Sequence, residues 1–261
     1  MKFSSYFLFI CSLLLTWPAL ADKITVAAAS DLKFAMDEIV IDFRQSHPGD
    51  AVDVVYGSSG NFHTQIQQGA PYDLFFSADI GFPRELAARG MAGSEVIPYA
   101  VGRIVLWSTS LDATKMTLNS LADPKISRIA IANPKHAPYG KRAEEALRAS
   151  GLWEKLESRL VYGETVVQAA QFVQSGSAQA GIIALSLASN PELAGKGGYW
   201  LIPPQLHQPL EQGFIMTKRA EGNPLAKRFA DYMSSPSIRT VMRRYGFVLP
   251  GEASSTPAAS K

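Results

Sequence analysis

The chain has 261 residues, of which 47% are apolar and 18% are charged, and its formal net charge is +2. This length allows one large or two ordinary domains, and the apolar content is sufficient for a substantial core, which excludes a disordered or fibrous protein. A nearly neutral chain, without a lysine and arginine run interleaved with aromatic residues, gives no support for binding to nucleic acid or to an anionic membrane.

The N-terminus has the pattern of a secretory signal peptide. Lys2 precedes an apolar run over residues 7–17, and Ala-Leu-Ala at 19–21 supplies a small-x-small cleavage site. The run is too short for a stable membrane span. We therefore expect residues 1–21 to be removed; a retained membrane anchor is the alternative.

The single cysteine, Cys11, lies inside that apolar run, and the two residues before it are not the small ones that a lipoprotein signal places there. The mature chain would then contain no disulfide, no thiolate nucleophile and no thiolate metal site. Export without disulfides is typical of a bacterial periplasmic or secreted protein that is stabilised by its core alone.

Strand and helix patterns alternate along the mature chain. The first strand pattern, residues 24–29, runs into Ser30, a favoured N-cap residue, and apolar residues then recur at helical spacing over 32–43. Further strand patterns lie at 51–56, 73–78, 101–107, 129–132, 160–162, 180–184 and 214–216. Further helix patterns lie at 62–68, 83–87, 143–147, 166–173, 224–233 and 237–244.

This alternation predicts the α/β class, with doubly wound parallel sheets that carry helices on both faces. The succession of units restarts near Arg128, so two sheets are expected rather than one. The chain would cross to the second sheet near residues 102–106 and return near residues 212–217. The two crossing segments would then be hinge strands between two domains.

The corresponding domain boundaries follow from these crossings. Residues 22–104 and 214–250 would form a discontinuous first domain, and residues 105–213 the second. Residues 251–261 are rich in Ser, Ala and Pro and are predicted to be a flexible tail.

Four strand-to-helix turns stand out, two in each predicted domain: Ser30-Asp31, Ser58-Ser59-Gly60, Pro138-Tyr139-Gly140 and Glu164-Thr165-Val166. Open α/β sheets bind ligands at such turns, and a helix N-terminus favours an anion because its N–H groups are unpaired. Converging in a closed cleft, the turns would bind a small, doubly charged oxyanion with neutral donors alone. The alternative is that each hydroxyl merely caps its own helix.

Asp31 bears on which anion would bind. If its carboxylate points inward, it repels a dianion but could accept the proton of hydrogen phosphate, which would indicate a phosphate-binding protein. Sulfate, molybdate and tungstate carry no such proton at neutral pH. We expect Asp31 to face outward in the first helical turn, where negative charge is stabilising.

A secreted serine hydrolase is the competing functional class. His63 lies four residues after Ser59, and a carboxylate such as Glu164 or Asp31 could complete a catalytic set. However, residues 56–60 lack the Gly-x-Ser-x-Gly spacing, so we expect His63 to lie on a helix surface and no catalytic residue to be present. The other histidines are His47, His136 and His207. They are dispersed and show no metal-ligand spacing, so no metal or cofactor is expected.

The sequence resembles the periplasmic molybdate-binding proteins of ABC importers over nearly all of the mature chain. The matching stretches, in the expected order, are ITVAAAS at 24–30, YGSSG at 56–60, GAPYDLFFSAD at 69–79, PKHAPYG at 134–140, GII at 181–183 and RYGF at 244–247. The resemblance implies the type II periplasmic binding protein fold. It also implies capture of a tetrahedral oxyanion, molybdate first and tungstate nearly equally, by a monomer that delivers it to a permease–ATPase complex in the inner membrane.

The resemblance also implies binding positions. Ser30, which closes the Ala-Ala-Ala-Ser motif, and Ser59, in the middle of the serine cluster, would each donate a hydroxyl and a backbone N–H. Tyr139 would offer its N–H and its phenol, and Val166 its N–H. The possible secondary positions are Asp31, Ser58, Thr165 and Ala184.

Ala184 departs from the family's pattern, because many relatives have a tyrosine there whose hydroxyl reaches the anion. Tyr139, from the neighbouring loop, could replace that hydroxyl. Otherwise the ligand keeps fewer bonds or differs from molybdate. A binding protein for phosphate or sulfate is therefore the alternative within the same class.

Overall fold

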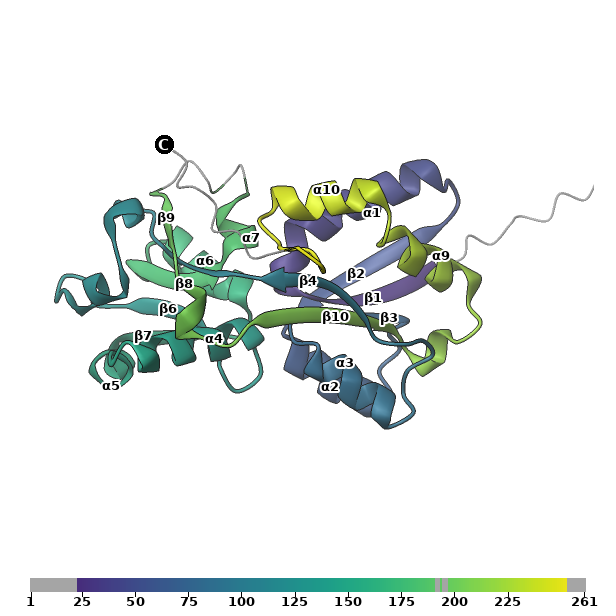
Figure 1. Ribbon diagram of the computed structural model, residues 1–261, viewed down its shortest axis with the longest axis horizontal. Coiled ribbons are helices and arrows are strands. Elements are labelled where there is room, and N and C mark those ends of the chain that lie inside the picture. Colours follow the sequence, from purple (N-terminus) through teal and green to yellow (C-terminus); the bar gives the residue numbers. More distant parts are fainter. Residues whose placement is uncertain (1–22, 191–192, 194–196, 253–261) are drawn as a thin grey trace, which may run out of the picture.

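The computed structural model describes residues 23–190, 193 and 197–252. The predicted signal peptide, residues 1–21, lies outside the described residues, as does the predicted tail from residue 253 onward. The described chain forms two lobes that lie side by side, each built on a five-stranded sheet (Figure 1). No helix in this part of the chain is long and apolar enough to span a membrane.

The sheet of the first lobe has the strand order β2-β1-β3-β10-β4. Its strands are β2 (Ala51–Gly57), β1 (Lys23–Ala29), β3 (Leu74–Ser77), β10 (Leu210–Met216) and β4 (Ile97–Gly102). Pairing of β1 with β2 and β3 is parallel, whereas β10 runs antiparallel to both of its neighbours.

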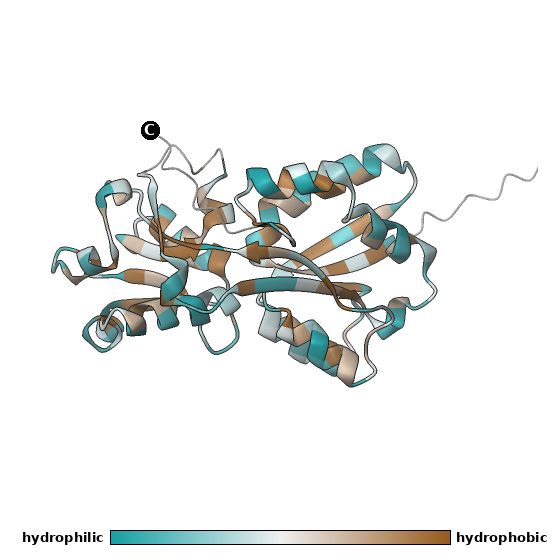
Figure 2. Ribbon diagram, in the orientation of Figure 1, coloured by the Kyte–Doolittle hydropathy of each residue, from teal (hydrophilic) through white to brown (hydrophobic). Residues whose placement is uncertain are grey.

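Helices cover both faces of this sheet. Ile24, Val26 and Ala28 of β1 belong to the core under α1 (Lys33–Ser46), α9 (Pro224–Tyr232) and α10 (Pro236–Arg244). Ala27 belongs to the core on the other face, under α2 (Ser59–Gln67) and α3 (Gly81–Ala88). The strand is thus apolar on both sides because both sides are buried. In Figure 2 much of the hydrophobic colour accordingly lies on the strands, and the hydrophilic colour is prominent on the outer helices.

The second lobe repeats this arrangement with the strand order β7-β6-β8-β5-β9. Its strands are β7 (Leu160–Gly163), β6 (Ile129–Ala132), β8 (Ala180–Ala184), β5 (Ile104–Trp107) and β9 (Tyr199–Leu201). The helices are α4 (Pro138–Ala149), α5 (Trp153–Leu156), α6 (Val166–Gln174) and α7 (Leu185–Ala188). In both lobes together, the described residues form the 3-10 turns η1 (Ser30–Leu32), η2 (Ala113–Lys115), η3 (Leu118–Ala122), η4 (Glu157–Arg159), η5 (Pro204–Leu206) and η6 (Lys218–Ala220).

Each sheet is mixed, whereas the sequence predicted parallel sheets. In the first sheet the reversed strand is β10, and in the second it is β5, which is antiparallel to β8 and β9. Both strands follow a crossing from the other lobe, so the chain enters the sheet from the opposite end. The α/β class with two layered lobes is otherwise confirmed.

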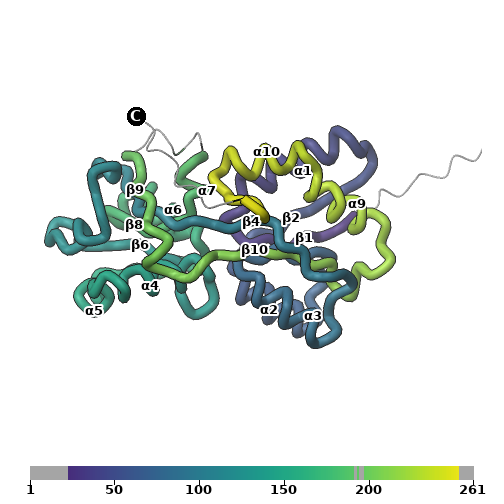
Figure 3. The backbone as a smooth tube through the Cα atoms, in the orientation of Figure 1, coloured from purple at the N-terminus to yellow at the C-terminus, as the bar shows by residue number. Residues whose placement is uncertain are grey.

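Two connections join the lobes. The apolar pattern predicted as one strand over 101–107 is divided at Arg103, so that β4 ends in the first sheet and β5 begins in the second. The return is complete by Leu210, which pairs with Gly102. The two connections therefore lie side by side, as the tube in Figure 3 shows. The predicted domain boundaries, and the prediction that the domains move about these two connections, stay predictions.

Candidate anion-binding site between the lobes

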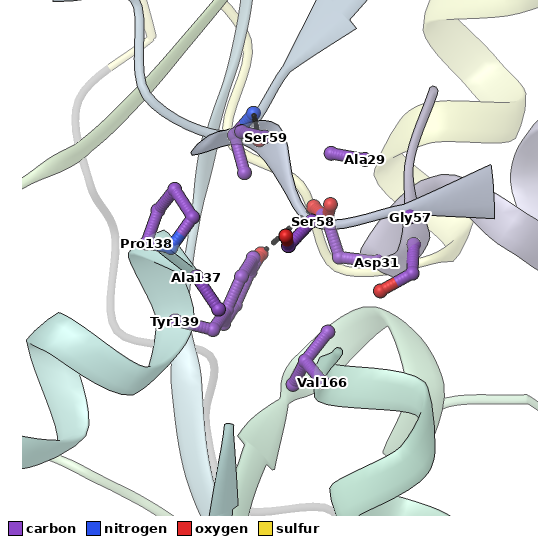
Figure 4. Close-up of a pocket in the computed structure, with 11 residues that line it drawn as sticks. Ala29, Asp31, Gly57, Ser58, Ser59, Ala137, Pro138, Tyr139 and Val166 are labelled. Atoms are coloured by element: carbon purple, nitrogen blue, oxygen red, sulfur yellow. Dashed lines mark hydrogen bonds between the residues drawn. The ribbon is translucent and has the colours of Figure 1, made fainter. Parts of the chain in front are cut away.

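A small cavity lies where the first turns of four helices from both lobes meet (Figure 4). It holds about 200 Å³ of empty space, part of it open to solvent. None of the described residues that line it is a lysine, arginine or histidine. They are Ala29, Ser30, Asp31, Gly57, Ser58, Ser59, Ala78, Ala137, Pro138, Tyr139 and Val166.

Ser30 reaches the cavity from the end of β1. It opens the 3-10 turn η1 rather than the α-helix, and neither η1 nor α1 has a side-chain cap bond at its start. For Ser30, the alternative that the hydroxyl merely caps its own helix is therefore wrong. Its side chain is buried in the wall of the cavity instead, as the oxyanion hypothesis requires.

The two serines after β2 have different partners. Ser59 is the first residue of α2, and its Oγ accepts the N–H of Ala78 at 3.0 Å, so its own proton is left for another acceptor. Ser58 occupies the N-cap position without capping the helix. Its Oγ lies 3.0 Å from Nδ1 of His136, in the other lobe.

The second lobe contributes the N-termini of α4 and α6. Pro138 is the first residue of α4, and Tyr139 follows it with its ring fully inside the structure. Val166 is the first residue of α6. Thr165 caps that helix by accepting the N–H of Gln168 at 3.1 Å, so for Thr165 the simple capping alternative holds. Helical N–H groups in these first turns have no partner within the helix.

Ala184 does not line the cavity. It is the last residue of β8 and is fully buried beside the start of α7. Tyr139 does line the cavity, so its phenol is near enough to replace the hydroxyl that a tyrosine at position 184 would supply.

Asp31 faces inward, contrary to the expectation that it would point to solvent. The residue is 1% exposed, and its Oδ2 accepts the Tyr139 hydroxyl at 3.0 Å and the Gln212 side-chain amide at 2.8 Å. Figure 4 draws the bond to Tyr139 across the cavity. The outward expectation assumed an α-helical first turn, whereas the residue lies in the tighter 3-10 turn η1.

The carboxyl of Asp31 has unusual electrostatics. Burial raises its pKa to about 7, although hydrogen bonds from Gln212 and Tyr139 act to lower it. Its Oδ1 has no hydrogen-bond partner, and neither has Oε1 of Gln212. Burial also raises the pKa of Tyr139 and of Tyr99 well above the usual value, with the nearby Asp31 charge as a further cause.

Three residues around the cavity were not singled out in the sequence. Gln212 is fully buried in β10, and Ser186 in α7 donates to the backbone carbonyl of Asp31 at 2.7 Å. His136 joins the lobes, because its carbonyl also accepts the N–H of Gly60 at 3.0 Å. A Cβ on Gly60 would lie 2.7 Å from that carbonyl oxygen, so only glycine permits this approach. Gln212 lies just before the strand predicted at 214–216 and next to Glu211, so no sequence signal distinguished it.

The residues proposed for a hydrolase do not assemble as the alternative required. His63 is buried rather than on a helix surface: its Nε2 lies 3.3 Å from Glu85, and its ring lies 5.0 Å from that of Phe82. Glu164 contacts His136 instead, at 3.2 Å. Among the described residues, no group of three or more His, Cys, Asp or Glu side chains could hold a metal ion.

Comparison with known proteins gives a consistent set of matches. The family model described as "Bacterial extracellular solute-binding protein" matches residues 24–248. The chain is 35% identical to the molybdate-binding protein ModA of Rhodobacter capsulatus over 238 residues, which covers 90% of this chain and 91% of the relative. It is 36% identical to ModA of Azotobacter vinelandii, over 90% of this chain and 94% of the relative.

Solved structures match in the same way. The periplasmic molybdate-binding protein of Azotobacter vinelandii superposes with a TM-score of 0.82 at 32% identity, covering 87% of this chain and 99% of that chain. The sulfate-binding protein SubI of Mycobacterium tuberculosis superposes with a TM-score of 0.72 at 15% identity, covering 88% of each chain. The second match concerns the fold alone.

Proposed function

The chain belongs to the bacterial extracellular solute-binding proteins, in the family that includes the molybdate-binding proteins ModA, and we propose that it captures molybdate between its lobes and delivers it to an ABC transporter. Membership of this family makes it a binding protein rather than an enzyme. Tungstate, with the same charge and shape, would bind nearly as well.

The observation that carries the proposal is the chemistry of the cavity wall. Hydroxyl groups and the first turns of helices meet there without a basic side chain among the described lining residues. Helix N-termini attract anions, and hydrogen bonds to an ionised acceptor are about twice as strong as neutral ones. A small oxyanion therefore suits the site, whereas a cation or a large organic ligand does not.

Each lobe supplies donors to this arrangement. Ser30 and Ser59 would donate their hydroxyls from the first lobe, and Tyr139 and Val166 would donate backbone N–H groups from the second. Binding would then select the closed form, because only in that form do both sets of donors reach the same ion. The Tyr139 hydroxyl would donate a further hydrogen bond to the anion when its proton is not donated to Asp31.

The remaining features of the proposal concern the cell. The signal peptide would be cleaved after Ala21 and the mature protein would work in the periplasm. It would act as a monomer, with the loaded closed form as the species that the permease–ATPase complex receives. No cofactor is needed, because the ligand is the cargo.

A second candidate ligand is favoured by one observation. Asp31 points into the cavity and its Oδ1 has no partner, so an ionised Asp31 could accept the proton of hydrogen phosphate. Phosphate binding is therefore the alternative within the same class of protein.

Calorimetric titration of residues 22–261 tests the proposal. We expect molybdate and tungstate to bind with one site per chain, and sulfate and phosphate to bind far more weakly. Ser59→Ala should weaken molybdate binding by about tenfold or more, since a hydrogen bond to a charged group contributes about 1.5–3 kcal/mol. Ser46→Ala, on the exposed end of α1, is the matched control. Preferential binding of phosphate would contradict the proposal.

A further inference from the structure

The Asp31 carboxyl has one satisfied and one unsatisfied oxygen. Its Oδ2 accepts two hydrogen bonds, from Tyr139 and Gln212, whereas Oδ1 is buried without a partner. Oε1 of Gln212 is a second buried acceptor without a partner in the same cluster. Buried polar atoms are almost always paired, so this cluster lacks a hydrogen-bond donor.

An anion cannot supply that missing donor if it carries no proton. A fully deprotonated oxyanion brings only acceptors into a cavity whose wall already includes a buried carboxylate. Like charges in a low-dielectric site repel strongly, and each disfavours the charged form of the other. One proton on Asp31 would remove the charge and also convert Oδ1 from an acceptor into a donor.

The groups around Asp31 do not offer an alternative way to neutralise it. No ion pair among the described residues involves Asp31. Helices α6 and α7, which pack on its turn, contain no charged residue, and Lys33 at the start of α1 pairs with Asp37. Ionisable side chains beyond the cavity wall pair with each other, His136 with Glu164, and Arg142 with Glu145 and Asp79. The side chains that act on the carboxyl are uncharged at neutral pH: Tyr139 on α4, Tyr99 on β4 and Gln212 on β10.

We propose that Asp31 binds the oxyanion in its neutral, protonated form, so that capture of each molybdate dianion is linked to uptake of one proton. The inference rests on the proposed function and deepens it. The proton comes from solvent, adds to the carboxylate as the anion enters, and returns to solvent when the anion leaves. No bond within the anion forms or breaks.

The electrostatics of the empty site support this linkage. Burial already raises the pKa of Asp31 to about 7, and a bound dianion would raise it further. Well below pH 7 the carboxyl is neutral before binding, so the affinity should not depend on pH. Above pH 7 binding must take up a proton, so the affinity should fall by up to about tenfold per pH unit.

Calorimetry in pairs of buffers with different ionisation enthalpies measures the proton directly. At pH 8 we expect the wild-type protein to take up close to one proton per molybdate, and Asp31→Asn to take up none. The affinity of wild type should fall about tenfold between pH 7.5 and 8.5, whereas that of Asp31→Asn stays constant. Asp37→Asn removes a half-exposed carboxylate of α1 outside the cavity and should retain the wild-type pH dependence.

Three results would overturn the inference. Molybdate binding to wild type at pH 8 without proton uptake would do so while leaving the proposed function intact, and it needs no variant to fold. Phosphate bound by wild type and lost in Asp31→Asn would assign the proton to the ligand instead. A wild-type protein that binds no molybdate between pH 6 and 9 would overturn both the proposed function and this inference.

Discussion

At the scale of single residues, one hydroxyl connects the two lobes inside the cavity. Tyr139 donates to Asp31 of the other lobe, and its oxygen lies 3.2 Å from the Gln212 amide nitrogen. A Cβ on Gly102 would collide with this hydroxyl and would lie 2.6 Å from Gln212. The phenol is therefore held in a fixed position by its surroundings before any anion binds.

Removing that hydroxyl gives the first prediction. If the phenol turns its proton from Asp31 to the anion, Tyr139→Phe should weaken molybdate binding by at least about 1 kcal/mol, because one charge-assisted hydrogen bond is lost. Calorimetry measures the change, with Tyr162→Phe, an exposed tyrosine of the same lobe, as the control. Unchanged affinity would show that the phenol does not reach the anion.

The second prediction concerns the stability of the protein without a ligand. The pKa of Asp31 is about 7 in the folded state, against a usual 3.8, so the folded state holds the extra proton between these values and stability falls as pH rises through this range. Asp31→Asn should therefore raise the free energy of unfolding at pH 8 by up to about 4 kcal/mol relative to wild type. At pH 4 the gain should be small. Thermal unfolding of variant and wild type at both pH values checks this; an equal difference at both would be inconsistent with the raised pKa.

The sequence motifs located those site residues whose position depends only on the neighbouring strand and helix. Ser30, Ser59, Tyr139 and Val166 all line the same cavity, because each lies at a strand-to-helix turn that the apolar pattern locates. The inward position of Asp31 could not be predicted in this way. It depends on Gln212, which is 181 positions away along the chain, and on a 3-10 turn that no propensity distinguishes from the start of an α-helix.

At the scale of elements, the loop before α4 is bound to the start of α2. His136 contacts Ser58 through Nδ1 and receives the N–H of Gly60 at its carbonyl, so two bonds join the lobes next to the cavity. If its other nitrogen donates to Glu164, Nδ1 accepts the Ser58 hydroxyl. Ser58 would then be a contact between the lobes rather than a donor to the anion.

This contact gives the third prediction. His136→Ala should weaken molybdate binding by about 1 kcal/mol, since it removes a hydrogen bond between the lobes that opening would break. Ser58→Ala should have a similar effect, and the double variant should lose no more than either single variant. Calorimetry on all four proteins completes the double-mutant cycle. Strictly additive losses would mean that the two side chains act separately.

The order of elements was predictable because helical and strand periodicities differ, and every predicted strand and helix has a counterpart. The mixed sheets were not predictable, since periodicity carries no strand direction. The pattern over 101–107 gave no sign that Arg103 separates strands of different sheets, because apolar residues continue on both sides of it.

At the scale of the whole molecule, two lobes of similar design close on a cavity that neither could form alone. The connections between them run side by side, where Gly102 pairs with Leu210. Hydrogen bonds from Tyr139, Ser186 and His136 cross between the lobes around the cavity, and opening would have to break them. The arrangement fits a hinge that the ligand closes.

The fourth prediction follows from this hinge. Small-angle X-ray scattering should show a smaller radius of gyration when molybdate is added, because the ligand selects the closed form. His136→Ala without ligand should be at least as open as the wild-type protein. A radius of gyration that is unchanged by saturating molybdate would argue against closure on the ligand.

The central claim is that one oxyanion is held by both lobes at the same place. Crystals of the mature protein grown with molybdate, measured above and below the molybdenum absorption edge, locate the metal atom of the anion without any assumption about its surroundings. The account predicts one anomalous peak per chain, within hydrogen-bonding reach of Ser30 and Ser59 on one side and of Tyr139 and Val166 on the other. A peak on the outer surface of one lobe, or no peak at saturating molybdate, would contradict it.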